Sequence, residues 1–137
     1  MTQNPSGPNP YAPPPASAIQ LTPQEERSWS IGVHVVTGAA MVLSAGTLGF
    51  VAALVVYLMY KDRGPFVRHH SANALNIQLT SLVWGVAVFV FGIVTIGVGW
   101  ALFLVIPFVA GALHLLGAMA AFRGEWTNPP LTIRFIR

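Results

Sequence analysis

Two long apolar blocks dominate the pattern of residues along the chain. Residues 28–60 and 71–122 contain no Asp, Glu, Lys or Arg. Uncharged apolar stretches of this length are typical of membrane-spanning segments. Buried helices of a soluble protein are the alternative, but a chain of 137 residues has too few polar residues to enclose two such blocks. The pattern therefore predicts an all-α, polytopic membrane protein.

The first block is too long for a single crossing. One straight helix over residues 28–60 would be ~50 Å long, whereas the hydrocarbon core of a bilayer is ~30 Å thick. Small and weakly polar residues at 44–47 suit a turn. We therefore expect two short spans, at about 28–44 and 47–60. A re-entrant hairpin, which enters and leaves the bilayer on one side, is the alternative.

The second block predicts two further spans. They are expected at about 72–94 and 100–122, separated by a glycine-rich turn. Pro107 should kink the last span, because proline leaves the carbonyl one turn earlier without its donor. The expected architecture is four transmembrane helices in two hairpins, within residues 22–124.

The two ends of the chain differ from its centre. Residues 1–21 are rich in Pro, Asn, Ser and Ala and carry no charge, which predicts a disordered tail. The first helix should begin directly after it, because Thr22, Pro23 and Glu25 have the spacing of an N-cap, a first-turn proline and a capping box. Residues 125–137 are too short and too interrupted by proline to cross again, so we expect an interfacial segment that lies on the surface or against the bundle.

The charged residues indicate the orientation. Seven Lys and Arg and four Asp and Glu make up 8% of the chain, whereas about a quarter of the residues of a soluble domain are charged. They flank the apolar blocks without forming a continuous basic face, which argues against a nucleic-acid partner. With four spans every charge lies on one side, and the excess of cations places that side in the cytoplasm. We expect a multi-pass protein of the cytoplasmic membrane, in contact with the lipid bilayer, with both termini cytoplasmic.

No recognisable set of catalytic residues is present. The chain has no cysteine, which excludes thiolate chemistry. It also has no phosphate loop, nucleophile motif or paired carboxylates. The adjacent His69 and His70 would point about 100° apart on a helix and do not easily share one ion. We therefore expect neither an enzyme nor a cofactor or metal site.

A polar stripe marks the start of the third predicted span. His69, Asn73, Asn76 and Thr80 recur at helical spacing and so share one face of the helix. Hydrogen bonding to a neighbouring helix is one explanation of such a stripe in lipid. A groove for a partner or a solute is the other.

Two histidines are expected at membrane depth, His34 in the first span and His114 in the last. Ionisable residues there are functional candidates, although a neutral imidazole bonded to another helix also explains each. His34 should lie near the depth of the polar stripe. Our hypothesis is therefore a polar pocket that faces the cytoplasm and contains His34, His70, Asn73 and Asn76.

Residues 61–78 read KDRGPFVRHHSANALNIQ. Together with Glu25–Trp29 and the closing Arg123–Glu125, they resemble a widespread prokaryotic family of small membrane proteins of unknown function. That family is distantly similar to the twenty-kilodalton component of the chloroplast inner-envelope protein import complex. The resemblance covers about residues 22–136 and implies a four-helix membrane domain with both ends in the cytoplasm.

These patterns lead to two functional hypotheses. The first is a non-enzymatic scaffold or accessory subunit that contacts an unidentified membrane or cytoplasmic protein, in protein insertion, translocation or envelope organisation. The second is a small oligomeric channel or transporter for an ion or small solute, in which the stripe lines a water-filled path and Gly46 and Pro107 break the helices. Small residues on the first and fourth spans also permit a homo-oligomer.

Overall fold

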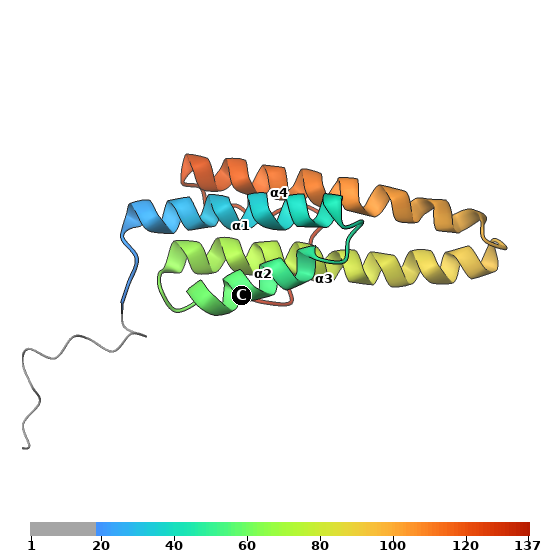
Figure 1. The fold of residues 1–137 in the computed structure, drawn as a ribbon, viewed down its shortest axis with the longest axis horizontal. Helices are drawn as coiled ribbons and strands as arrows, with labels where there is room; N and C mark the ends of the chain where they lie inside the picture. The colour runs from blue at the N-terminus through green and yellow to red at the C-terminus, as the bar shows by residue number, and fades with distance from the viewer. Residues whose placement is uncertain (1–18) are drawn as a thin grey trace, which may run out of the picture.

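The computed structural model describes residues 19–137. They form four α-helices and one 3₁₀ helix and contain no strand, which confirms the all-α prediction (Figure 1). The elements are α1 (Pro23–Leu43), α2 (Gly49–Tyr60), α3 (Pro65–Val94), η2 (Val98–Leu104) and α4 (Val105–Arg123). The predicted disordered tail lies outside the described residues, except for residues 19–21.

The start of α1 is capped as the sequence predicts. The Thr22 hydroxyl accepts a hydrogen bond from the Glu25 amide at 3.3 Å, and the Glu25 carboxylate accepts one from the Thr22 amide at 2.8 Å. The backbone bond from Thr22 holds the pKa of Glu25 below its ordinary value. This reciprocal pair satisfies donors that the first helical turn leaves free.

A second acidic residue of α1 caps α3. The Glu26 carboxylate accepts hydrogen bonds from the Phe66 and Val67 amides, at 2.7 and 3.1 Å. A side chain at Gly64 would collide with it, because a Cβ there would lie 2.2 Å from Glu26 Cδ. Negative charge at a helix N-terminus is favourable, so Glu26 ties the starts of α1 and α3 together.

The two helical hairpins differ in length (Figure 1). The turn between α1 and α2 ends beside the middle of α3, where Ala45, Gly46 and Thr47 line the same cavity as Gln78 and Gly85. Gly46 has φ +101°, which favours glycine. Beyond this turn only α3, η2 and α4 continue, as a two-helix extension.

The prediction of four spans is not supported. Among residues 19–137 only two helical stretches, Pro65–Val94 and Val98–Arg123, are long and apolar enough to cross a membrane. α2 has 12 residues and is therefore ~18 Å long, against a core of ~30 Å. α1 carries Glu25, Glu26 and Arg27 close to its start, and these side chains belong in water. The sequence block was long enough for two helices, but each helix is too short or too polar to cross.

We call residues 86–106 the apolar arm. Its only polar side chains are Thr95 and Trp100, and both are bonded within the arm. Thr95 Oγ1 donates to the Phe91 carbonyl at 2.8 Å, and Trp100 Nε1 donates to the Phe89 carbonyl at 3.2 Å. The exposed large side chains of the arm are all apolar or aromatic: Val86, Phe89, Val90, Phe91, Ile93, Val94, Ile96, Val98, Trp100, Leu102, Phe103, Leu104 and Val105. Such a surface suits lipid rather than water.

We call the rest of the bundle the four-helix half. It contains α1, α2 and the parts of α3 and α4 that pack against them. Its interior mixes small apolar residues, such as Ala53, Ala74 and Ala110, with buried polar ones. α4 ends at Gly124, which has φ +74°, and the Glu125 amide closes the helix by bonding the Ala120 carbonyl at 2.9 Å. The chain then returns along α3 as the C-terminal segment, residues 125–137.

Candidate functional site

Three histidines from three helices meet inside the four-helix half. His34 lies on α1, His70 on α3 and His114 on α4, and each side chain is at most 2% exposed. Nδ1 of His34 lies 3.3 Å from Nδ1 of His114, and Nε2 of His34 lies 3.4 Å from Nδ1 of His70. The ring of His34 therefore bridges the other two.

The row of rings is bonded to the protein at both ends. Nε2 of His70 lies 3.1 Å from the carbonyl oxygen of Glu125, at the start of the C-terminal segment. Nε2 of His114 lies 3.0 Å from the side-chain amide of Gln78, on α3. We call His70, His34, His114 and Gln78 the histidine chain. Every ring nitrogen in it has a hydrogen-bonding partner.

The Glu125 carbonyl sets the direction of all these hydrogen bonds, because a carbonyl oxygen only accepts. Nε2 of His70 must donate to it, which leaves Nδ1 of a neutral His70 to accept from Nε2 of His34. Nδ1 of His34 then accepts from Nδ1 of His114, and Nε2 of His114 accepts from the Gln78 amide. One consistent set of tautomers thus satisfies the whole neutral chain.

Glycines provide the space that these side chains occupy. A Cβ at Gly117 would lie 2.3 Å from the His34 ring, and one at Gly38 would lie 2.9 Å from His114 Cβ. A Cβ at Gly49, the first residue of α2, would lie 2.7 Å from the Gln78 amide. Since real Cβ atoms do not approach so closely, larger residues at these positions would displace the chain.

The polar stripe of α3 binds the C-terminal segment. Asn76 makes three bonds to its backbone: Nδ2 donates to the Ile136 carbonyl at 2.8 Å, and Oδ1 accepts from the Phe135 and Ile136 amides at 3.0 and 2.9 Å. The Thr80 hydroxyl accepts from the Ile133 amide at 2.9 Å. These contacts hold an otherwise irregular segment against the helix.

The other end of the stripe binds the start of the same segment. Asn73 Nδ2 donates to the Thr127 carbonyl at 3.1 Å, and His69 Nε2 lies at the same distance from that oxygen. We call His69, Asn73, Asn76 and Thr80 the C-terminal clamp. Its polar groups are bonded to the same chain, so this face of α3 is covered.

The structure divides the predicted pocket into two sites. His34 and His70 belong to the histidine chain, together with His114, which sequence reasoning considered separately. Asn73 and Asn76 belong to the clamp, which binds the C-terminal segment. A role of any of these residues in binding a partner or solute stays a prediction.

Sequence reasoning did not identify Gln78 as a site residue, although its spacing from His70 could have suggested it. His70 and Gln78 are two helical turns apart and therefore lie on one face of α3. The sequence could therefore have placed His70 and Gln78 on the same face of one helix. It could not have predicted that His114 of another helix packs against that face. Pairing across helices is a tertiary property.

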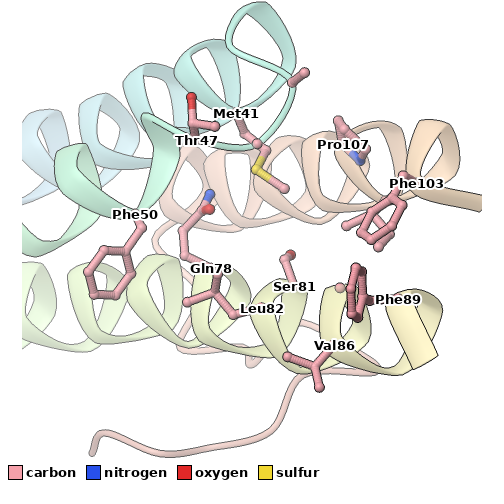
Figure 2. Close-up of a pocket in the computed structure, with 14 residues that line it drawn as sticks. Met41, Thr47, Phe50, Gln78, Ser81, Leu82, Val86, Phe89, Phe103 and Pro107 are labelled. Atoms are coloured by element: carbon pink, nitrogen blue, oxygen red, sulfur yellow. The ribbon is translucent and has the colours of Figure 1, made fainter. Parts of the chain in front are cut away.

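A cavity of about 580 Å³ lies between the α1–α2 turn and the helices α3 and α4. Figure 2 shows the Gln78 side chain rising from α3 toward the turn, and Phe89 and Phe103 at the far end. Thr47, Gln78 and Ser81 supply polar groups to an otherwise apolar lining. The Gln78 end of the histidine chain therefore borders this cavity, half-way along the molecule.

All charged side chains lie at the opposite end of the four-helix half. They come from residues 25–27, 61–68 and 123–137, and we call this region the charged end. Arg123 and Glu125 pair there, with bonds of 2.7 and 2.9 Å. The hydrogen bonds from Arg123 hold the pKa of the Glu125 carboxyl below its ordinary value. Among residues 19–137, no group of three or more His, Cys, Asp or Glu side chains is arranged to hold a metal ion.

A comparison with protein families identifies the family to which the chain belongs. The model of the magnetosome magnetite crystal formation protein family matches residues 25–136, which include the histidine chain, the clamp and all the helices except the first two residues of α1. The chain belongs to this family. Searches among the curated proteins and among the solved structures each find no match.

Membership of the magnetosome crystal formation family corrects the resemblance to the chloroplast import component, which is wrong. The motif that carried it, residues 61–78, with 65–78 as its most specific part, has structural tasks in this fold. Gly64 admits the Glu26 carboxylate, His70 and Gln78 belong to the histidine chain, and Asn76 holds the C-terminal segment. A short motif explained by such tasks does not identify a transport function. The expected role in protein insertion or translocation loses its basis with the resemblance.

Proposed function

We propose that this protein is a non-enzymatic accessory protein that is anchored in a membrane by its apolar arm and acts through protein contacts at its charged end. The observation that carries the proposal is the separation of the two surfaces. Every charge lies at one end, and the exposed side chains of residues 86–106 are apolar.

The dimensions support an anchored protein. α3 has 30 residues and is therefore ~45 Å long, enough to cross a hydrocarbon core of ~30 Å and project from it. α3 and α4 run in opposite directions, so a crossing by both leaves the starts of α1 and α3 and the end of α4 on one side. The shorter α1–α2 hairpin then enters the bilayer and returns. The excess of Lys and Arg at the charged end supports a cytoplasmic location of that side.

Family membership suggests the setting in which such a protein acts. The family is that of magnetosome magnetite crystal formation. We infer that this chain serves that process as an accessory of the membrane rather than as a catalyst, because the side chains of the histidine chain are bonded to one another and to the Glu125 carbonyl. The histidine chain contains no hydroxyl, thiol or carboxylate side chain.

Site-directed photocrosslinking in native membranes tests the proposal. A photoreactive residue is placed at Asp62 or Arg134 in the charged end, and in a matched variant at Ile96, the tip of the apolar arm. We expect adducts with specific proteins from the first two positions and adducts with lipid from the third. Protein adducts only from Ile96, or none from the charged end, would contradict the proposal.

The oligomeric channel or transporter has no comparable support. The cavity beside Gln78 ends at Phe89 and Phe103, and the arm beyond it offers only Thr95 and Trp100 as polar side chains. A water-filled path along one copy of the chain would therefore have to cross an apolar stretch. Only an assembly of several copies would provide one.

A further inference from the structure

The histidine chain has two ends of different character. At one end the Glu125 carbonyl accepts a hydrogen bond and cannot donate one. At the other end Gln78 carries an amide nitrogen that donates and an amide oxygen that accepts. A Cβ placed on Gly49 would be 2.7 Å from the nitrogen and 2.8 Å from the oxygen, so both atoms occupy equivalent positions against α2. A half-turn of the amide therefore exchanges them in place.

We propose that the histidine chain binds one proton and transfers it between its Gln78 end, beside the cavity, and its Glu125 end, at the charged end of the protein. Nothing in the proposed accessory function requires this activity. It rests on the connectivity of four side chains and one carbonyl.

The neutral chain accepts a proton without losing a hydrogen bond. A hydronium ion in the cavity gives its proton to Nε2 of His114 and becomes water, and the Gln78 amide turns so that its oxygen accepts from this new N–H donor. His114 then donates from both nitrogens, to Gln78 and to Nδ1 of His34. Every contact again pairs one donor with one acceptor.

The charge can then move along the rings. The Nδ1–H bond of His114 breaks as an N–H bond forms at Nδ1 of His34, which becomes the imidazolium. The Nε2–H bond of His34 breaks as one forms at Nδ1 of His70. His70 is then the imidazolium and donates from Nε2 to the Glu125 carbonyl. The proton leaves the chain by the reverse moves, because loss of the Nε2 proton would leave a bare nitrogen against that carbonyl. Each step exchanges one bond for another, and the two inter-ring distances, 3.3 and 3.4 Å, suit hydrogen-bonded transfer.

A second proton does not fit. Three rings and two accepting ends provide partners for four N–H groups, so a fifth would place two donors against each other at one contact. It would also put two positive charges into a buried row of rings. The connectivity therefore limits the chain to one proton.

The groups that surround the histidine chain do not form part of its row of hydrogen bonds, so the three rings of the chain should titrate together. His69 is the nearest other histidine, with its ring centroid 5.2 Å from that of His70. The carboxylates near the chain are committed elsewhere: Glu26 to the start of α3 and Glu125 to Arg123. The remaining charged or titratable groups on the packed elements lie toward the charged end or on α2: Arg27, Arg68, Arg123, Tyr57 and Tyr60.

Nitrogen NMR of the full chain in lipid nanodiscs, with ¹⁵N-labelled histidine, tests the proposal. At neutral pH we expect Nε2–H tautomers for His34 and His70 and the Nδ1–H tautomer for His114. On acidification, the signals of these three rings should move with one common midpoint and a total uptake of one proton per chain. Three separate midpoints, or uptake of more than one proton before unfolding, would overturn the proposal.

Variants of Gln78 provide the second measurement. In Gln78→Glu a carboxylate replaces the amide, so the common midpoint should rise by at least about one pH unit, which is a tenfold gain in proton affinity. In Gln78→Leu the protonated chain loses its terminal acceptor, so the midpoint should fall. The matched control is Ser81→Ala, which removes another polar side chain of α3 from the same cavity and should leave the midpoint unchanged. A midpoint that moves with neither Gln78 variant, or that moves with Ser81→Ala, would refute the assignment, and the Gln78→Glu result stands even if Gln78→Leu does not fold.

Discussion

The four-helix half and the apolar arm solve the same physical problem in opposite ways. Both are built from α3 and α4, and both have to satisfy their polar groups away from water. The arm does so by having almost none, since Thr95 and Trp100 bond to carbonyls within it. The four-helix half instead buries three histidines and a glutamine and connects them end to end. One half is therefore suited to anchoring, and the other is suited to specific interactions.

The difference has an energetic consequence. The arm's packing is generic, so exchanges among apolar residues of similar size should be tolerated there. The histidine chain is cooperative, because losing one ring leaves its neighbours with buried, unpaired nitrogens. Substitutions should therefore have larger effects in the four-helix half, and the predictions below test this from the largest effect to the smallest.

Replacement of Gly117 by alanine should have the largest effect. The new Cβ would lie 2.3 Å from the His34 ring, which would have to move away from both His70 and His114. Overpacking and two lost hydrogen bonds together should cost about 3 to 4 kcal/mol. The free energy of unfolding in mixed micelles measures this loss.

The control for Gly117→Ala is Gly32→Ala, a glycine of α1 with open space around its Cβ position. Alanine there should stabilise the helix by up to about 1 kcal/mol, because glycine has the lower helix propensity. Equal effects of the two substitutions on the free energy of unfolding would show that alanine at position 117 acts through helix propensity and does not displace the His34 ring.

The sequence predicted single elements better than their assembly. The capping box at Thr22 was predicted correctly, because capping depends on residues a few positions apart. The number of spans was not, because residues 28–60 have the composition of two spans but fold into a hairpin that stops beside the middle of α3. Hydropathy indicates whether a segment can lie in lipid. How far the segment extends along the bundle depends on the helices that pack against it.

The candidate site shows the same limit. Helical spacing identified the stripe of His69, Asn73, Asn76 and Thr80, yet the groups that it binds are backbone atoms of the C-terminal segment. The pattern of side chains in a sequence does not predict which backbone atoms a polar side chain will bind. His34 and His114 were recognised one by one, and only the fold places their Nδ1 atoms 3.3 Å apart.

A charge in the apolar arm should have the next largest effect. Val86 is 66% exposed on α3, and Val86→Lys would place an ammonium group in lipid at a cost of about 2 to 3 kcal/mol. We expect a smaller fraction of the protein to resist alkaline extraction from membranes. Ile19→Lys is the control, because Ile19 is 54% exposed and precedes Leu21, whose amide bonds the Arg63 carbonyl at the charged end. If both lysines reduced membrane retention equally, the arm would not be the anchor.

Loss of the central clamp residue should have a local effect. Asn76→Ala removes all three side-chain bonds to Phe135 and Ile136, each worth about 1 kcal/mol, and should release the end of the C-terminal segment. Cleavage by trypsin after Arg134 should become several-fold faster, while the helices remain folded. Asn73→Ala, which breaks a bond to Thr127 instead, should leave cleavage at Arg134 nearly unchanged. Cleavage that is equally fast in the wild type would mean that the clamp does not hold the segment.

The smallest effect is expected at the charged end. Arg123 and Glu125 form a two-point ion pair, but both side chains are exposed, and water and salt screen such pairs. Because the pKa of Glu125 is lowered, any stabilisation by the pair is complete at neutral pH and is lost only as the pH falls through that lowered value. Glu125→Gln should therefore leave the unfolding temperature at neutral pH unchanged within error. The backbone carbonyl of Glu125 survives this substitution, so the histidine chain should keep its end acceptor and its ring signals. A large loss of stability in Glu125→Gln would show that the Glu125 carboxylate, and not only its carbonyl, supports the buried rings. The surface ion pair would then contribute to stability as the buried histidine chain does, which would contradict the comparison made above.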